Sequence, residues 1–113
     1  MANVVRTWGP VIVWMALIFV LSSQASDGRH SELAVLLRKF AHVCEYLVLT
    51  LLLRRALPPL AAALVALAYA ASDEWHQTFV PGREGAPRDV AIDGIGITLA
   101  SVLVPRIRRP RPA

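Results

Sequence analysis

The sequence predicts an all-α integral membrane protein, a bundle of four transmembrane helices, and three observations support this fold class. Residues of the AVILMFWYC set make up 56% of the 113 residues, whereas ordinary soluble domains contain roughly 45–50% apolar residues. Charged residues make up only 18%, against a usual share of about 25%. These charges gather in short patches between long apolar runs. A soluble domain this small needs more polar surface, so a soluble enzyme, a disulfide scaffold and a disordered tail are poor fits.

Four apolar runs define the predicted helices within one domain, residues 1–113. We expect membrane spans at about 7–23, 32–53, 57–76 and 89–105. The third run opens with Pro58 and Pro59, which suit the first turn of a helix because no amide donor is needed there. Each run is somewhat shorter than the roughly 20 apolar residues that cross a typical bilayer. We therefore expect the helices to extend into polar ends or to sit in a locally thinned bilayer.

A signal peptide is the alternative interpretation of the first run. Arg6 precedes the run, and Ser23-Gln24-Ala25 after it has the small-x-small pattern of a cleavage site. The rest of the chain is equally hydrophobic and would gain little from losing its first helix. Four spans are therefore the working prediction.

The placement of Lys and Arg predicts that both termini face the cytoplasm. In that orientation the cytoplasmic segments hold seven basic residues, namely Arg6, Arg54, Arg55, Arg106, Arg108, Arg109 and Arg111. The outer segments hold five, namely Arg29, Arg38, Lys39, Arg83 and Arg88. The net charge of +4 does not predict nucleic-acid binding, because the basic residues flank apolar runs instead of alternating with aromatic residues. The single cysteine, Cys44, excludes an internal disulfide.

Small residues recur every four positions in the last two runs. They are Ala62, Ala66 and Ala70 in the third run, and Gly96 and Ala100 in the fourth. Such spacing lets helix backbones approach closely inside lipid and predicts helix contact. For the third run, an alanine-rich span without special meaning is an equal alternative.

Three groups of polar side chains interrupt the runs and supply the candidate functional residues. The groups are Lys39, His42, Glu45 and Tyr46 in the second run; Asp73, Glu74, His76 and Gln77 in the third; and Asp89 and Asp93 in the fourth. Helical spacing places most members of each group on one face. With both termini inside, all three groups lie at the extracytoplasmic end.

The cost of burying charge in a membrane indicates that these three groups form a functional site. A charged side chain at the bilayer centre costs roughly 2.5–3.5 kcal/mol, so turning the carboxylates inward, onto one another, onto Lys39, Arg83 and Arg88 or onto water, is cheaper. Structural interpretations stay open for each group. These are snorkelling of Lys39, a packed His42–Glu45 pair, helix-end capping by Asp73 and Glu74, and an interhelical hydrogen bond from Asp93.

Four segments carry a resemblance to a known family: Ile18 to Gln24 (IFVLSSQ), Arg38 to Tyr46 (RKFAHVCEY), Ser72 to Arg83 (SDEWHQTFVPGR) and Asp89 to Gly96 (DVAIDGIG). In order and spacing they resemble the VanZ-like family of small bacterial membrane proteins. The resemblance implies a multi-pass protein of the bacterial cytoplasmic membrane and a link to resistance to the lipoglycopeptide teicoplanin. It implies no settled biochemical activity.

The polar positions typical of the family are also present. They are Lys39, His42, Glu45, Tyr46, Asp73, Glu74, His76, Gln77, Arg83 and Asp89. One departure is Asp93, where relatives often place Asn. This extra ionisable group would change the number of protons that the site can exchange relative to other family members.

The favoured hypothesis is an envelope protein that binds or modifies the headgroup of a lipid or cell-wall precursor. Its candidate headgroup-binding residues are Lys39, Tyr46, Gln77, Arg83 and Asp89. Whether the protein is an enzyme is left undecided. The candidate catalytic residues are His42, Glu45, Asp73, Glu74 and His76, because histidine exchanges protons near neutral pH and carboxylates orient it.

Two alternatives use the same residues. One is a membrane-embedded hydrolase or transferase, in a metal-assisted form if His42, His76 and carboxylates were ligands. No helix carries the two-histidine zinc pattern, so no metal is assigned, and the sequence specifies no cofactor. The other is a proton-linked small transporter. Four helices are few for a monomeric carrier, so this alternative uses a homodimer.

Overall fold

The computed structural model describes residues 2–22, 31–80 and 87–104, and these residues form four α-helices and no β-strand. The helices are α1 (Ala2–Ser22), α2 (Glu32–Leu53), α3 (Pro59–Gln77) and α4 (Pro87–Val102). The predicted all-α fold class is therefore confirmed for the described residues.

Local sequence explains where the middle two helices begin. Ser31 is the N-cap of α2, and its hydroxyl accepts a hydrogen bond from the backbone N–H of Ala34 at 3.0 Å. Glu32 lies in the first turn, where a negative charge is favourable beside the helix dipole. Pro58 and Pro59 open α3 as expected.

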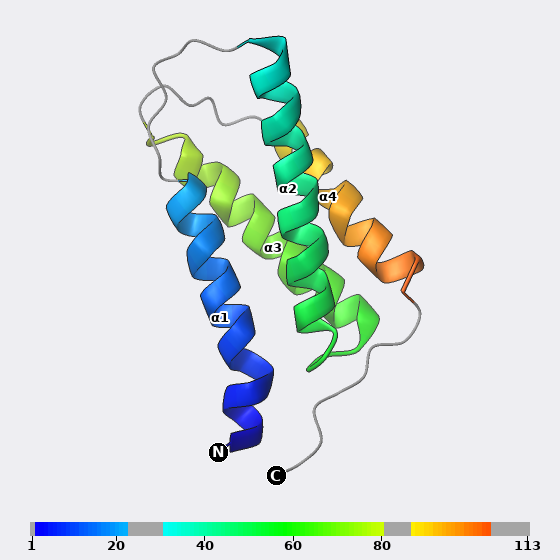
Figure 1. Ribbon diagram of the computed structural model, residues 1–113. Helices are drawn as coiled ribbons and strands as arrows, with labels where there is room; N and C mark the ends of the chain where they lie inside the picture. Colours follow the sequence, from blue (N-terminus) through cyan, green and yellow to red (C-terminus); the bar gives the residue numbers. More distant parts are fainter. Residues whose placement is uncertain (1, 23–30, 81–86, 105–113) are drawn as a thin grey trace.

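The four helices alternate in direction (Figure 1). Helices α1 and α3 run toward one end of the bundle, and α2 and α4 run toward the other. The most extensive contact joins α2 to α4, and α3 packs against both. Val11, Ile18, Tyr46, Leu49, Leu53, Ala62, Ala66, Ala70 and Ile97 form the hydrophobic core.

The small residues lie at the helix contacts. Ala62, Ala66 and Ala70 are fully buried, so this stripe of α3 is a packing face. At Gly96 of α4, an added Cβ would overlap the carbonyl oxygen of Val43, so the backbones of α2 and α4 touch there. Both stripes are therefore buried at helix contacts, and the predicted close approach of two helix backbones is present at Gly96.

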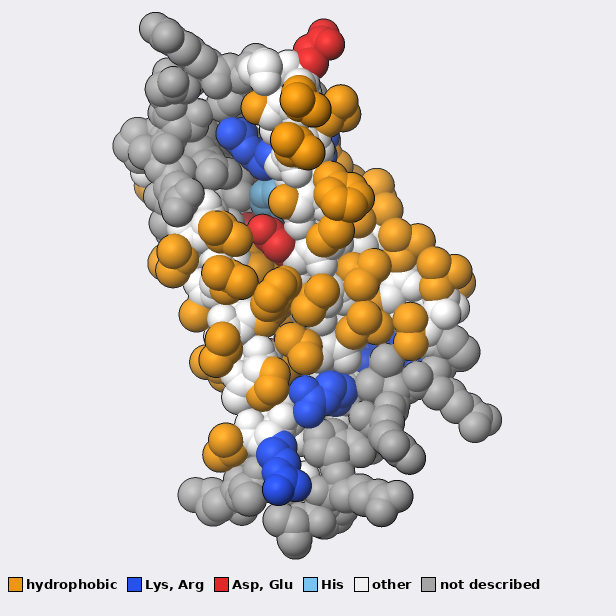
Figure 2. Space-filling view, viewed as in Figure 1, with side chains coloured by type: hydrophobic (Ala, Val, Ile, Leu, Met, Phe, Trp, Pro, Cys, Tyr) orange, Lys and Arg blue, Asp and Glu red, His pale blue; other side chains and the backbone are white. Residues whose placement is uncertain are grey.

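The outer surface of the bundle is apolar. Large hydrophobic side chains are more than half exposed on all four helices, including Val13, Phe40, Leu60 and Ile95. Figure 2 shows hydrophobic side chains covering most of the visible face between the two ends, with Lys and Arg side chains at the lower end. This pattern inverts that of an ordinary soluble bundle.

Among the described residues, one helix is long and apolar enough to cross a membrane by length and composition, Asn3–Ser22, with a mean hydropathy of 2.0. The shorter segment Val90–Val102 is also apolar. Helix α2 carries four charged residues, Glu32, Arg38, Lys39 and Glu45, and α3 ends in a polar run. The four-span topology therefore stays a prediction.

Candidate functional site

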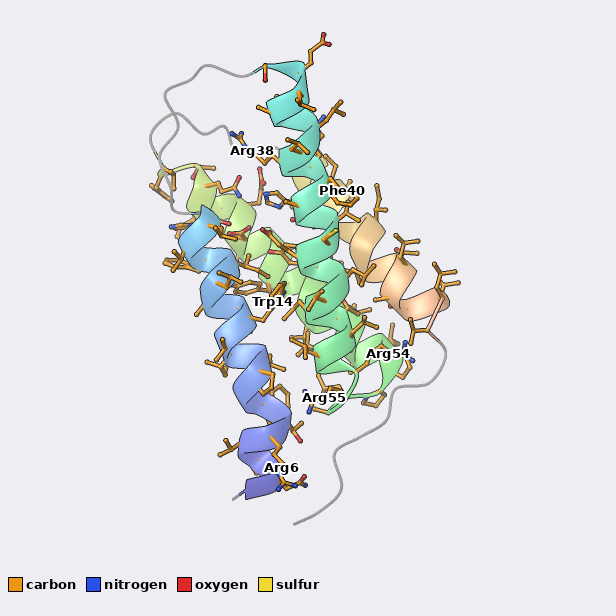
Figure 3. All side chains as sticks on the ribbon, viewed as in Figure 1. Arg6, Trp14, Arg38, Phe40, Arg54 and Arg55 are labelled. Atoms are coloured by element: carbon orange, nitrogen blue, oxygen red, sulfur yellow. The ribbon has the colours of Figure 1, made fainter. Side chains whose placement is uncertain are left out.

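All four helices contribute polar side chains to one end of the bundle. We call this the polar end, and it is where α1 and α3 finish and α2 and α4 start. At the opposite end Figure 3 labels Arg6, Arg54 and Arg55, and we call this the basic end. Near the polar end, the side chain of Arg38 projects from α2 toward the side of the bundle on which α1 and α3 lie (Figure 3).

A histidine–carboxylate pair joins α2 to α4 at the polar end. Nδ1 of His42 lies 2.9 Å from Oδ1 of Asp93, and their side chains are 14% and 2% exposed. With Asp93 ionised, its carboxylate can only accept a hydrogen bond, and Nδ1–H of His42 is then the donor. This contact fixes the orientation of the ring and leaves Nε2 as the second functional atom.

The interhelical hydrogen bond that was one interpretation of Asp93 is present, and its partner is the side chain of His42. For His42, the structural interpretation from sequence had indicated Glu45 as the packed partner. A signal for the observed pair was present, because Asp93 lies one turn before Gly96, and that face of α4 contacts α2.

A second pair joins α2 to α3. The hydroxyl of Tyr46 donates to Oδ2 of Asp73 at 3.4 Å, and both side chains are buried. The buried side chain of Ser22, the last residue of α1, lies beside the same carboxylate. Tyr69 stacks obliquely on Tyr46, with 6.3 Å between ring centroids. Asp73 is therefore in contact with α1 and α2.

Asp73 and Gln77 have hydrogen-bonding capacity that the described residues leave unused. Both side chains are 4% exposed. Within the described part of the chain, Oδ1 of Asp73 accepts no hydrogen bond and Nε2 of Gln77 donates none. Buried polar atoms in native proteins nearly always have a partner, so these two atoms are candidates for an added polar contact.

Helix α1 is attached to the site by aromatic side chains. Trp14 donates from Nε1 to the backbone carbonyl of Glu45 at 2.8 Å. The hydroxyl of Tyr69 donates to the backbone carbonyl of Met15 at 2.6 Å. The rings of Phe19 and His76 stack with 4.4 Å between centroids. These contacts hold α1 against α2 and α3 where the polar side chains lie.

The remaining predicted site residues divide into three groups. Glu45 and Glu74 are half-buried at the polar end. Lys39 is exposed and is not among the buried polar side chains. Arg83 and the side chain of Asp89 lie outside the described residues. Among the residues that the structure describes, no group of three His, Cys, Asp or Glu side chains is arranged to hold a metal ion.

These features define a small helical bundle with a polar site buried at one end and an apolar exterior. The family model of VanZ/LLP1 matches residues 7–108. The chain belongs to the VanZ/LLP1 family, as the four sequence segments predict. No curated protein and no solved structure matches the chain.

Proposed function

We propose that this protein crosses the bacterial cytoplasmic membrane four times, with both termini in the cytoplasm, and binds the headgroup of a lipid or lipid-linked cell-wall precursor at its polar end. The observation that carries the proposal is the burial of polar side chains from all four helices at one end of a bundle whose outer surface is apolar.

The dimensions of the helices support membrane placement. They contain 16 to 22 residues, which at 1.5 Å per residue makes them about 24–33 Å long. The hydrocarbon core of a bilayer is about 30 Å thick. Apolar side chains on the outside of the bundle, such as Phe40 and Leu60, would lie against lipid, where their exposure has no penalty.

The distribution of charge supports the orientation. Arg6, Arg54 and Arg55 lie at the basic end, and Arg55 donates from Nη2 to the backbone carbonyl of Arg6 at 2.9 Å. Basic residues favour the cytoplasmic side of a membrane. The polar end would then face the outside of the cell.

The composition of the polar end suits a phospholipid or lipid-linked headgroup. Arg38 and Lys39 lie one turn from His42 on α2 and would attract a phosphate. Asp73 and Gln77 lie deeper and would contact uncharged polar atoms of the same headgroup. A site buried in lipid in this way is a functional site by default, because its polar groups are costly to keep there.

The test is identification of the lipids that the protein retains. Full-length protein, extracted from bacterial membranes in a mild detergent, is analysed by native mass spectrometry. We expect about one retained lipid whose headgroup is enriched several-fold over the bulk membrane. The double variant H42Q/D73N should lose the enrichment, and Thr98→Ala, at an exposed position of α4, should keep it. Retained lipids that mirror the bulk composition in the wild-type protein would refute the proposal.

Acid–base catalysis on the bound headgroup is a second candidate function, and the His42–Asp93 pair favours it. A carboxylate that holds one ring nitrogen of a histidine leaves the other to take or give a proton, which is the arrangement of a general base. In this case Nε2 of His42 would act on a hydroxyl or water of the substrate.

A further inference from the structure

The last turn of α3 presents two complementary polar atoms on one face. Asp73 and Gln77 are four residues apart, so their side chains emerge one above the other, about 6 Å apart along the helix axis. Oδ2 of Asp73 is occupied by the hydroxyl of Tyr46 at 3.4 Å. Within the described residues, the acceptor Oδ1 of Asp73 and the donor Nε2 of Gln77 have no partner.

Among the phosphate, ammonium and hydroxyl groups of lipid headgroups, the hydroxyl is the single group that satisfies both atoms at once. Oδ1 needs a donor and Nε2 needs an acceptor. An ionised phosphate only accepts, so it would leave Oδ1 unsatisfied and would meet the charge of Asp73. An ammonium group only donates, so it would leave Nε2 unsatisfied. A hydroxyl group donates one hydrogen bond and accepts others.

We infer that the polar end selects a lipid whose headgroup is a polyol, such as glycerol or a sugar, through a hydroxyl that donates to Oδ1 of Asp73 and accepts from Nε2 of Gln77. This inference rests on the proposed headgroup-binding function and names its ligand class. The surroundings agree with it, because Asp93, Glu45 and Glu74 occupy the same end and disfavour a second anion beside Asp73.

The pair lies close to the end of its helix. Gln77 is the last residue of α3, and Asp73 lies one turn earlier. A headgroup that enters at the polar end therefore needs to pass only about one helical turn to meet both atoms.

Four lipids with identical acyl chains form the test. Phosphatidylglycerol carries a phosphate and hydroxyls, phosphatidylmethanol carries the phosphate alone, phosphatidylethanolamine carries a phosphate and an ammonium, and glucosyl diacylglycerol carries hydroxyls alone. Each is titrated into the purified full-length protein in a nonionic detergent, and the Kd is read from intrinsic tryptophan fluorescence. We expect phosphatidylglycerol to bind about tenfold more tightly than phosphatidylmethanol, because it adds two buried hydrogen bonds.

Matched variants locate the effect. Asp73→Asn and Gln77→Glu keep the shape of each side chain but change its hydrogen-bonding capacity. In both, the ratio of the two Kd values should fall to near one. Ser72→Ala is the control, because Ser72 is exposed and its hydroxyl bonds to its own helix at Tyr69. Since each ratio is measured on one preparation, a partly unfolded variant lowers both signals and not the ratio.

The outcomes separate this inference from the proposed function. If no lipid binds saturably, headgroup binding itself is refuted. If phosphatidylglycerol and phosphatidylmethanol bind equally to the wild-type protein, headgroup binding stands and polyol selection is refuted. Tightest binding of phosphatidylethanolamine, strengthened in Gln77→Glu, would also refute it and identify an ammonium ligand. Saturable binding of the glucosyl lipid would support the polyol class and identify a sugar as its source.

Discussion

At the scale of single residues, the polar end is built from pairs that cross between helices. His42 of α2 contacts Asp93 of α4, and Tyr46 of α2 contacts Asp73 of α3. Each pair satisfies groups that would be costly to leave alone in a low-dielectric interior. The same contacts that place the candidate site therefore also fix the relative rotation of the helices.

The His42–Asp93 pair should show energetic coupling. We expect His42→Gln and Asp93→Asn each to lower the free energy of unfolding by about 1–3 kcal/mol, because each change weakens a buried, charge-assisted hydrogen bond. The double variant should lose less than the sum of the two. Thermal unfolding in detergent, followed by circular dichroism, measures the effect. Additive losses would mean that the two side chains do not interact.

The same variants distinguish binding from catalysis. Cells with the gene, without it, and with His42→Gln are compared by lipid mass spectrometry. A catalytic His42 predicts that the variant matches the deletion in lipid composition even at normal protein level in the membrane. An unchanged lipid composition in all three would remove acid–base catalysis as a candidate function.

At the scale of helices, close packing depends on residues with small side chains or none at the helix contacts. Gly96 lets the backbone of α4 meet that of α2 at Val43, and the alanine stripe of α3 is fully buried in the core. The close α2–α4 contact is also what brings His42 within hydrogen-bonding distance of Asp93. Helix packing and site geometry are thus one feature of the fold.

Gly96 and Gly94 form a matched pair for testing this contact. We expect Gly96→Ala to lower the free energy of unfolding by about 1–3 kcal/mol, because the new Cβ would overlap backbone atoms of α2. The Cβ added by Gly94→Ala would have no neighbouring atom within 4 Å. This variant should be neutral or stabilised by up to about 1 kcal/mol through helix propensity. Unfolding temperatures in the same detergent provide the comparison. Similar unfolding temperatures for the two variants would contradict the close α2–α4 contact.

Arg54 shows how a charge at the basic end acts on another helix. Only 5% of its surface is exposed, and its Nη1 donates to the backbone carbonyls of Ala100, at 2.8 Å, and Val104. These are carbonyls of the last turn of α4 and just beyond it, which lack partners within their own helix. A residue that the sequence placed in a cytoplasmic connection therefore also caps α4.

At the scale of the whole molecule, the apolar exterior and the two polar ends define an axis. The basic end holds Arg6, Arg54 and Arg55, and the polar end holds the candidate site. If the membrane lies across this axis, both features follow from it, because apolar side chains meet lipid and charges meet water or one another.

Cysteine labelling tests this topology. Cys44, the only cysteine, is first replaced by alanine, and single cysteines are introduced by Glu32→Cys at the polar end or Pro58→Cys at the basic end, both exposed positions. A membrane-impermeant maleimide should label position 32 in intact cells and position 58 only after permeabilisation. The reverse result would invert the orientation. Labelling of both positions in intact cells would contradict the four-span arrangement.

The sequence by itself determined the class of the protein. Apolar runs, proline positions and four-residue spacings of small side chains are local features, so they predicted helices, their approximate limits and their packing faces, and the family followed from ordered motifs. Only the tertiary structure decided the pairings. His42 contacts Asp93, Tyr46 contacts Asp73, and Lys39 is exposed. Helical spacing had placed His42, Tyr46 and Lys39 on the same face of α2. The reason is physical: which members of a face are buried depends on how far each helix rotates about its own axis, and contacts between distant segments set that rotation.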